Sequence, residues 1–229
     1  MRGGIPLDYD PDIPPESRAA VRAALDTLPE GTILVPEALF ADRPDLAAIA
    51  HRLRGVDLIH LFEGHYTPIV ETQDLRRPPA RPAVVAAYEA FTGETVRPAG
   101  GQAAWLSGLT LFESADGFAY LTDGPDRTLG FLPEPLHLIH APGWLLPRGR
   151  AGDILRALDA CDPRRIPAYA AHLTAQGGLD SADAAALVAM GEVMHGRTEE
   201  RAQELATRID AFHAALDAAT RPASGAVAA

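Results

Sequence analysis

The segment over residues 94–140 constrains the fold most, because proline, glycine and alternating apolar residues follow one another in it. Pro98 disfavours helix at the residue before it, so the chain is predicted to be extended there. Gly100 and Gly101 allow a turn with positive φ, after which an apolar run predicts a short helix over residues 103–109. The segment therefore begins as strand, turn and helix.

Three further strands are predicted after this helix. Phe118, Tyr120 and Thr122 alternate with other apolar side chains, which is typical of a strand. The sequence Asp-Gly-Pro-Asp-Arg over residues 123–127 has the composition of a tight turn. The arms TLGFL and PLHLIH then complete a predicted three-stranded antiparallel meander. Helical patterns elsewhere in the chain make the expected fold class α+β.

The N-terminal region has the order of elements that is typical of a winged helix-turn-helix. Apolar spacing predicts a helix over residues 17–28 with Ser17 as its N-cap, and a short strand follows it. Two more helices are predicted, the second capped by Asp45 at its start and by Gly55 at its end. A hairpin with its turn at Glu63-Gly64 comes next. In a winged helix the third helix enters the major groove of DNA and the hairpin lies along the backbone.

Composition shifts divide the chain of 229 residues into segments. We predict an acidic flexible arm over residues 1–16, the winged helix over 17–75, a stiff Arg/Pro linker over 76–82, a central antiparallel-sheet domain with packed helices over 83–147, a helical region over 148–220 and a disordered tail over 221–229. A helix near residues 84–91 is expected to pack on the central strands. The last helix is expected to begin at Thr198. Its apolar stripe at coiled-coil spacing predicts either core packing or a surface for a partner helix.

Two stretches of the central region, VRPAGGQAAWLSGL and AYLTDGP, together resemble the core domain of the AbiEi-type antitoxins of type IV toxin–antitoxin pairs. In that family a Pro-small-Gly turn and a short helix precede a strand that ends in Leu-Thr-Asp/Asn-Gly. The resemblance covers residues 20–140. The wing of the family ends in Gly-x-Tyr, as residues 64–66 do here, whereas Glu63 replaces the usual basic residue before it. The matching motif residues are Arg97, Pro98, Gly100, Tyr120, Leu121, Thr122, Asp123, Gly124 and Pro125.

The resemblance implies a transcriptional regulator that binds the promoter DNA of its own operon and neutralises a nucleotidyltransferase-like toxin. Contacts to DNA would then come from the winged helix and from the arginines of the linker, for which a plain solvated spacer is the alternative interpretation. The candidate DNA-binding residues are Arg43, His51, Arg52, Arg54, His60, His65, Arg76, Arg77 and Arg81.

The charge of the first third of the chain opposes DNA binding. Residues 1–75 contain six arginines and thirteen acidic residues, a net charge of −7 within a total of −11. Leaving out the four acidic residues of the arm still gives −3. Since affinity for DNA comes largely from neutralising phosphates, a basic face is expected of a winged helix that binds it. The alternative hypothesis is therefore a protein-interaction module whose winged helix no longer binds DNA and contacts a basic partner instead.

The histidines do not form a metal site of recognisable spacing. His60 and His65 lie on the two arms of the predicted hairpin, but no third ligand accompanies them. His137 and His140 are three residues apart in a predicted strand, which places them on opposite faces. No phosphate-binding glycine loop, serine elbow or zinc-protease motif is present in the sequence. We expect no enzymatic activity, no metal and no cofactor.

The remaining candidates have simple structural interpretations. Asp123 and Asp126 flank the central turn, where such carboxylates normally bond to the backbone. Trp144 and the two leucines after it would be a contact patch in an exposed loop, or more commonly a plug at the end of a sheet. Cys161 is the sole cysteine and fits an inert thiol in a reducing compartment. No signal peptide or membrane span is recognisable, so a cytoplasmic protein is expected, with no membrane partner.

Overall fold

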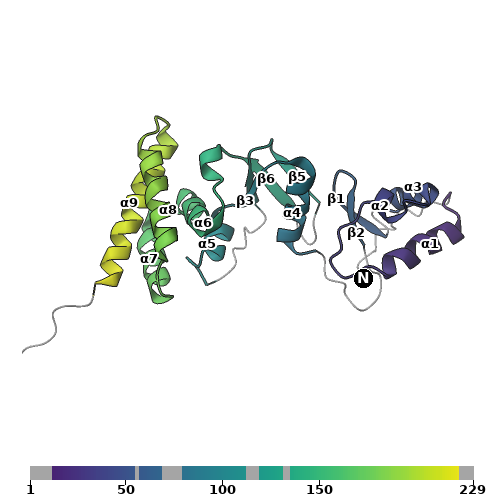
Figure 1. Cartoon of the computed structure of the whole chain (residues 1–229), viewed down its shortest axis with the longest axis horizontal. Coiled ribbons are helices and arrows are strands. Elements are labelled where there is room, and N and C mark those ends of the chain that lie inside the picture. Colours follow the sequence, from purple (N-terminus) through teal and green to yellow (C-terminus); the bar gives the residue numbers. More distant parts are fainter. Residues whose placement is uncertain (1–11, 55–56, 69–78, 112–118, 131–134, 222–229) are drawn as a thin grey trace, which may run out of the picture. The chain divides into compact units, whose positions relative to one another are not determined.

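The computed structural model describes residues 12–54, 57–68, 79–111, 119–130 and 135–221 (Figure 1). Its contacts divide the chain into two compact units, Met1–Glu94 with Thr128–Leu136, and Thr95–Arg127 with His137–Ala229. Helices and two small sheets make the fold α+β, as predicted. The predicted arm up to residue 11, the cap at Gly55, residues 69–78 with Arg76 and Arg77, and the tail after residue 221 lie outside the described residues.

From its first helix to the hairpin the first unit has the predicted order of elements, and a further helix follows the hairpin. The elements are α1 (Pro15–Asp26), α2 (Pro36–Leu39), α3 (Pro44–Arg52), β1 (Leu58–Phe62), β2 (His65–Pro68) and α4 (Arg81–Thr92). The predicted caps at Ser17 and Asp45 are wrong, because Pro15 and Pro44 occupy the first helical positions. Proline suits that position, since the N–H that it lacks would have no partner within the helix.

The β1–β2 hairpin is confirmed at the predicted turn. The two strands pair antiparallel, and Gly64 adopts a φ of 67° between them, a conformation that favours glycine. Leu34, in the extended segment before α2, pairs with Tyr66 through two backbone hydrogen bonds of 2.9 Å each. Apolar side chains of α1, α3 and β1 fill the core of this unit, among them Val21, Leu25, Ala50, Leu53 and Leu58.

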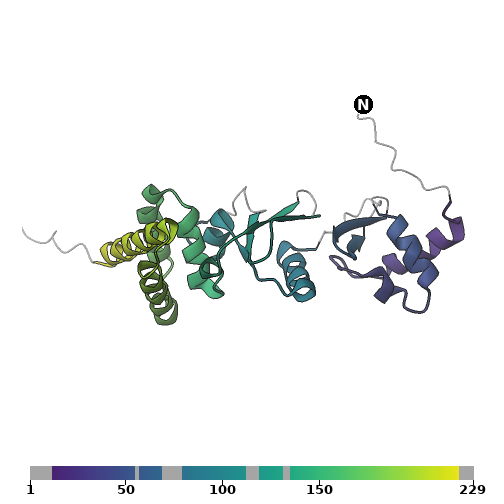
Figure 2. The same ribbon diagram turned by 90° about the horizontal axis from the view of Figure 1, so that it is seen from above.

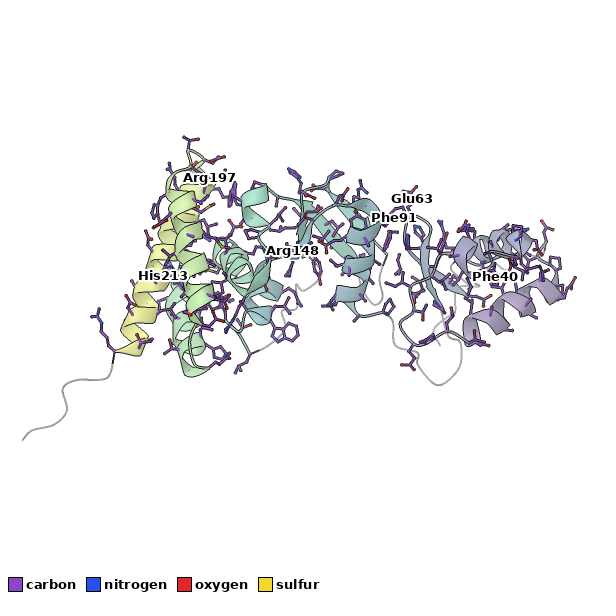
Figure 3. The ribbon with its side chains drawn as sticks, in the orientation of Figure 1. Phe40, Glu63, Phe91, Arg148, Arg197 and His213 are labelled. Carbon is purple, nitrogen blue, oxygen red and sulfur yellow. The ribbon has the colours of Figure 1, made fainter. Side chains whose placement is uncertain are left out.

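The helix α4 contacts the hairpin through aromatic side chains. The rings of Phe62 and Tyr88 meet edge to face at 5.4 Å, and Phe91 lies edge-on to His65 at 4.9 Å. Figure 3 labels Phe91 on α4 and Glu63 in the hairpin turn. The contacts therefore group α4 with the first unit, whereas the sequence predicted that this helix packs on the central strands.

The central strands exist, but the predicted antiparallel meander is wrong. The strands are β3 (Val96–Pro98), β4 (Ala119–Thr122), β5 (Arg127–Leu129) and β6 (Leu136–His140), in the spatial order β3-β4-β6-β5. The last strand lies between the two that the turn connects, and it runs parallel to β4. The turn does not close a hairpin, and the Asp126 carboxylate accepts the backbone N–H of His140, at the end of β6, at 2.6 Å.

Helices make up the rest of the second unit. They are α5 (Gly100–Leu106), α6 (Gly149–Ala160), α7 (Ile166–Ala175), α8 (Ser181–His195) and α9 (Glu200–Thr220), with short 3-10 turns at Gly143–Leu145 and Pro163–Arg165. In Figures 1 and 2 α7, α8 and α9 lie side by side. Asp180 caps α8 by accepting the N–H of Asp183 at 2.7 Å. Thr198 does not cap α9, whose N-cap is Glu199.

The apolar stripe of α9 belongs to the core of the second unit. Ala202, Leu205, Ile209 and Phe212 are each at most 1% exposed. A methyl group placed on Gly191 of α8 would lie 3.2 Å from Cγ2 of Ile209, so α8 approaches α9 closely there. The core interpretation of the stripe is confirmed, and the partner-helix alternative for it is wrong. In the part of the chain that the structure describes, no helix is both long enough and apolar enough to cross a lipid bilayer.

Candidate functional site

The cation at the start of α3 is already paired. Arg43 is the N-cap residue of α3, and its guanidinium donates two hydrogen bonds to the Asp45 carboxylate, at 3.1 and 2.8 Å. Both side chains are exposed, so the pair is screened by water and adds little stability. It does neutralise the arginine locally. A phosphate would have to compete with the Asp45 carboxylate for this guanidinium.

His51, near the end of α3, is held by two neighbours within the first unit. Its Nε2 hydrogen-bonds to Oε1 of Glu37 at 2.6 Å, and its Nδ1 to the Tyr66 hydroxyl at 2.9 Å. The hydrogen bond with His51 holds the pKa of the Glu37 carboxyl below its usual range. Both ring nitrogens are therefore engaged in joining α2, α3 and β2, and neither is available for a base edge without breaking one of these bonds.

The two hairpin histidines pack on aromatic rings. His60 lies 5.2 Å from the ring of Tyr66, centroid to centroid, and His65 stacks on Phe62 at 4.3 Å. Nδ1 of His65 also hydrogen-bonds to the backbone carbonyl of Glu63 at 2.7 Å. The hairpin pairs His60 with Tyr66 and His65 with Phe62, so the two histidines are not directly opposite each other. Within the described residues no group of three His, Cys, Asp or Glu side chains is arranged to hold a metal ion.

Two of the candidate arginines remain exposed at the end of α3. Arg52 occupies the last helical position, and Arg54 follows it and forms an isolated parallel bridge with Leu58. Arg81 is the first residue of α4 and is half-buried. Arg52 and Arg54 are thus exposed cations at the end of α3, from where they could reach an anionic ligand, as the DNA-binding hypothesis requires.

The stability of the hairpin is expected to depend on pH through His60. Burial lowers the pKa of the His60 imidazole below its ordinary value of 6.5, and repulsion by Arg54 and His51 acts in the same direction. Between the folded and the unfolded pKa the unfolded chain binds more protons, so the free energy of unfolding decreases as pH falls. The contribution is fully present above pH 6.5 and is lost as pH falls through the lowered pKa.

This dependence is measurable as hydrogen exchange of the β1 and β2 amides, corrected for intrinsic rates, at a series of pH values. His60→Gln should flatten the loss of protection below pH 6.5, whereas His137→Gln in the second unit should leave it unchanged. Equal slopes in wild type and His60→Gln would contradict the assignment to this imidazole.

The motif residues form one pair of strands in the second unit. Val96 pairs with Thr122, Arg97 with Leu121 and Pro98 with Tyr120 along antiparallel β3 and β4. Tyr120, Leu121 and Thr122 are buried, and so is most of Arg97, which donates to the carbonyl of Val96. Gly100 follows with a φ of 40° and begins α5, where a methyl group would lie 3.2 Å from Cβ of Ala160. The two halves of the motif are thus adjacent in space, because they contribute two paired strands to one core.

The carboxylates of the central turn bind backbone rather than each other. Asp123 accepts the N–H of Thr95 at 2.8 Å, and Asp126 accepts that of His140. Thr122 Oγ1 accepts the N–H of Gly124 at 3.0 Å. The ring of His140 also hydrogen-bonds to the Gly124 carbonyl through Nδ1 at 2.9 Å. These bonds join the turn to both neighbouring strands, which gives Asp123, Gly124 and the exposed Pro125 beside them a structural role.

Arg156 is the central residue that the sequence interpretation missed. It lies on α6 among buried apolar side chains and is 1% exposed. Its guanidinium donates to the carbonyls of Pro98, Leu145 and Pro147, at 2.9, 3.1 and 2.8 Å, and to the Asp153 carboxylate at 2.5 Å. Burial lowers the pKa of this guanidinium, and Asp153 opposes the shift. The Arg156 side chain thus fixes the end of the motif strand β3 against the loop before α6.

The remaining sequence candidates lie in or beside the same core. Leu145 and Leu146 are buried, and Trp144 is half-buried, so this segment closes the core more than it offers an open patch. Cys161 is buried, and burial raises the pKa of its thiol. A thiol with a raised pKa holds less thiolate at neutral pH and is a weak nucleophile.

Comparison with known proteins adds one structural likeness. No protein-family model and no curated protein matches this chain. Among solved structures it is similar to the crystal structure of the Rv2827c protein from Mycobacterium tuberculosis, at 14% sequence identity and a TM-score of 0.48, over 93% of this chain and 84% of that one.

Proposed function

We propose that this protein is an antitoxin-like transcriptional regulator, whose first unit binds operator DNA and whose second unit neutralises a nucleotidyltransferase-like toxin. The toxin partner rests on the resemblance of residues 97–125 to the AbiEi-type core. The DNA-binding half rests on the order of elements in the first unit, in which α3 would be the recognition helix and β1–β2 the wing.

The pairing of Leu34 with Tyr66 carries this proposal. The segment before α2 exchanges two backbone hydrogen bonds with β2, the second strand of the hairpin. This pairing joins the short extended segment after α1 to the hairpin, so the elements that have the winged-helix order are connected to one another. The exposed Arg52 and Arg54 then lie at the end of α3, where they would reach phosphates beside the major groove.

The proposal predicts salt-dependent binding to DNA from upstream of the protein's own gene. Arg52→Glu with Arg54→Glu should abolish binding, because two phosphate contacts become repulsive. Fluorescence anisotropy of labelled operator DNA over a salt series measures the salt dependence of the wild type and the loss of binding in the variant. Arg164→Glu with Arg221→Glu in the second unit is the matched control, since it changes the net charge equally at two exposed positions.

The two pairs of substitutions separate local contacts from overall charge. Loss of binding in the first pair alone supports a DNA site on α3. Equal loss in both pairs would mean that only net charge matters, and flat anisotropy of the wild type at low salt would overturn DNA binding.

A second candidate function is supported by side chains of the first unit that already bond to or pack on their neighbours. Arg43, His51, His60 and His65, four of the candidate DNA-binding residues that the structure describes, are each engaged by neighbours there. In this alternative the first unit contacts a protein, and the acidic chain suits a basic partner. Both proposals include a protein partner. Arg52→Glu with Arg54→Glu would leave toxin binding intact under this alternative, and no operator binding would be seen even in the wild type.

A further inference from the structure

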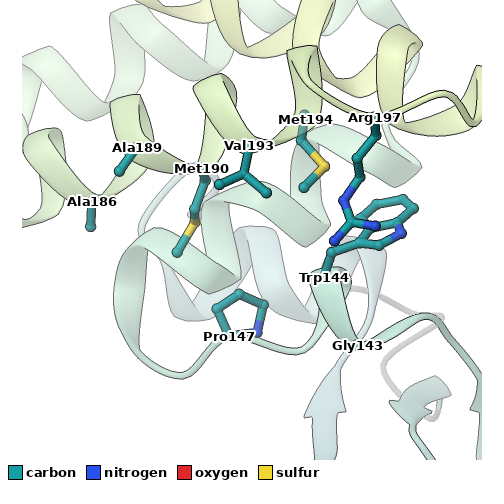
Figure 4. Close-up of a pocket in the computed structure, with 9 residues that line it drawn as sticks. All are labelled: Gly143, Trp144, Pro147, Ala186, Ala189, Met190, Val193, Met194 and Arg197. Atoms are coloured by element: carbon teal, nitrogen blue, oxygen red, sulfur yellow. The ribbon is translucent and has the colours of Figure 1, made fainter.

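An open pocket in the second unit has a mixed lining that none of the roles above uses. It has a volume of about 590 Å³, which lies in the usual range for small-molecule sites. Figure 4 shows α8 on one side and the loop before α6 on the other. The residues that matter for its chemistry are Trp144, Pro147, Met190, Val193, Met194 and Arg197.

The walls of the pocket are apolar. Met190, Val193 and Met194 lie three and four residues apart, so they share one face of α8 and face the pocket together. Val193 is 54% exposed, which is high for a branched apolar side chain beside the half-buried Trp144. Methionine side chains are flexible and adapt to the shape of an occupant. An apolar molecule placed here would remove this surface from water.

Arg197 supplies a cation at one end of the apolar walls. Its Cζ lies 5.8 Å from the centroid of the Trp144 ring, and the guanidinium lies over that ring in Figure 4. Its Nη1 is 3.6 Å from Oε1 of Glu199, which is too far for a hydrogen bond. Its Nε is withdrawn from solvent and finds no hydrogen-bond partner among the residues that the structure describes. The guanidinium therefore has N–H groups that can donate hydrogen bonds to a ligand.

We propose that this pocket binds a small amphipathic carboxylic acid. Its hydrocarbon body lies between α8 and Trp144, and its carboxylate accepts hydrogen bonds from Arg197. A planar guanidinium matches a carboxylate in a two-pronged geometry, and such charged hydrogen bonds are stronger than neutral ones. The acid displaces the loose contact of Arg197 with Glu199. This proposal does not rest on the DNA binding or the toxin binding proposed above.

The test uses dodecanoate and its uncharged analogue dodecanol as probes. Trp105→Phe leaves Trp144 as the sole tryptophan, so its emission reports the pocket alone. Dodecanoate should shift this emission to the blue with saturation. In the same background Arg197→Gln should weaken dodecanoate binding about tenfold or more, because charged hydrogen bonds are lost, and should leave dodecanol binding within about twofold.

Two further variants distinguish a defined pocket from general hydrophobic adsorption. Val193→Glu places a carboxylate among the apolar walls and should weaken both probes at least about tenfold. Val188→Glu is the matched control, because Val188 is also on α8 and 48% exposed but does not line the pocket, and it should change neither affinity. Arg164→Gln is the corresponding control for Arg197. Unchanged urea midpoints establish that the variants are folded.

Three results would overturn the proposal. They are a signal that never saturates, equal effects of Val188→Glu and Val193→Glu, and equal loss of dodecanoate and dodecanol binding in Arg197→Gln. The last would leave the pocket an apolar contact surface with no selectivity for acids.

Discussion

Replacing Arg156 with leucine is expected to lower the free energy of unfolding of the second unit by about 3–5 kcal/mol, the range for breaking a buried ion pair. The substitution leaves the Asp153 carboxylate without its partner and three backbone carbonyls without a donor. Water cannot easily replace the guanidinium, because its position is 1% exposed. Since a domain is typically stable by only about 5–15 kcal/mol, this single change removes a large part of the total.

Urea unfolding followed by tryptophan fluorescence measures this loss, because Trp105 and Trp144 both belong to the second unit. Arg156→Lys should lower the free energy of unfolding by an intermediate amount. Lysine keeps the positive charge, but its ammonium cannot donate to all four acceptors of the guanidinium. Arg164→Leu removes an exposed guanidinium from the same unit and should stay within about 0.5 kcal/mol of wild type. A loss of less than about 1 kcal/mol for Arg156→Leu would show that its hydrogen bonds are readily replaced.

The sequence predicts local elements of this fold better than their order in space. The hairpin at Glu63-Gly64 is recognisable because alternation and a glycine with positive φ are local properties. The turn at residues 123–127 has equally strong local signals, yet β6 lies between the strands that it joins. In that arrangement Asp126 bonds to His140, fourteen residues away, and no local pattern encodes such a contact.

The same holds for the candidate residues: their helix or strand can be predicted from neighbouring residues, but their contacts with residues far along the chain cannot. His51 is predicted as a DNA contact because it lies on the candidate recognition helix, but Glu37 and Tyr66, fourteen and fifteen residues away, engage both of its ring nitrogens. The sequence does not mark Arg156 as a candidate, because an arginine in a helix with apolar residues is usually expected on the exposed face. Its one available signal is the apolar run on both sides of it, Ile154-Leu155 and Ala157-Leu158, all of which are buried.

Gly152→Ala is expected to destabilise the second unit by about 2–4 kcal/mol, although alanine is favoured over glycine within a helix by about 1 kcal/mol. A methyl group at Gly152 of α6 would lie 2.2 Å from the carbonyl oxygen of Pro147, far inside van der Waals contact. The colliding atom is backbone, so the loop itself has to move. Gly196→Ala is the control, because its nearest atoms are 3.7 and 3.8 Å away and its φ of −76° suits any residue.

The cost of Gly152→Ala should depend on Arg156, since the displaced Pro147 carbonyl is one of the acceptors of that guanidinium. Moving the carbonyl breaks a hydrogen bond in wild type, but in the Arg156→Leu background this bond is already gone. The double variant should therefore be more stable than the sum of the two single losses implies, by about 1 kcal/mol or more, as for residues in contact. Additive losses in the same urea experiment would mean that the loop yields without disturbing Arg156. The close approach at Gly152 and the buried guanidinium would then stabilise the unit independently, and the tight approach of α6 to Pro147 would not be needed to hold the motif strand.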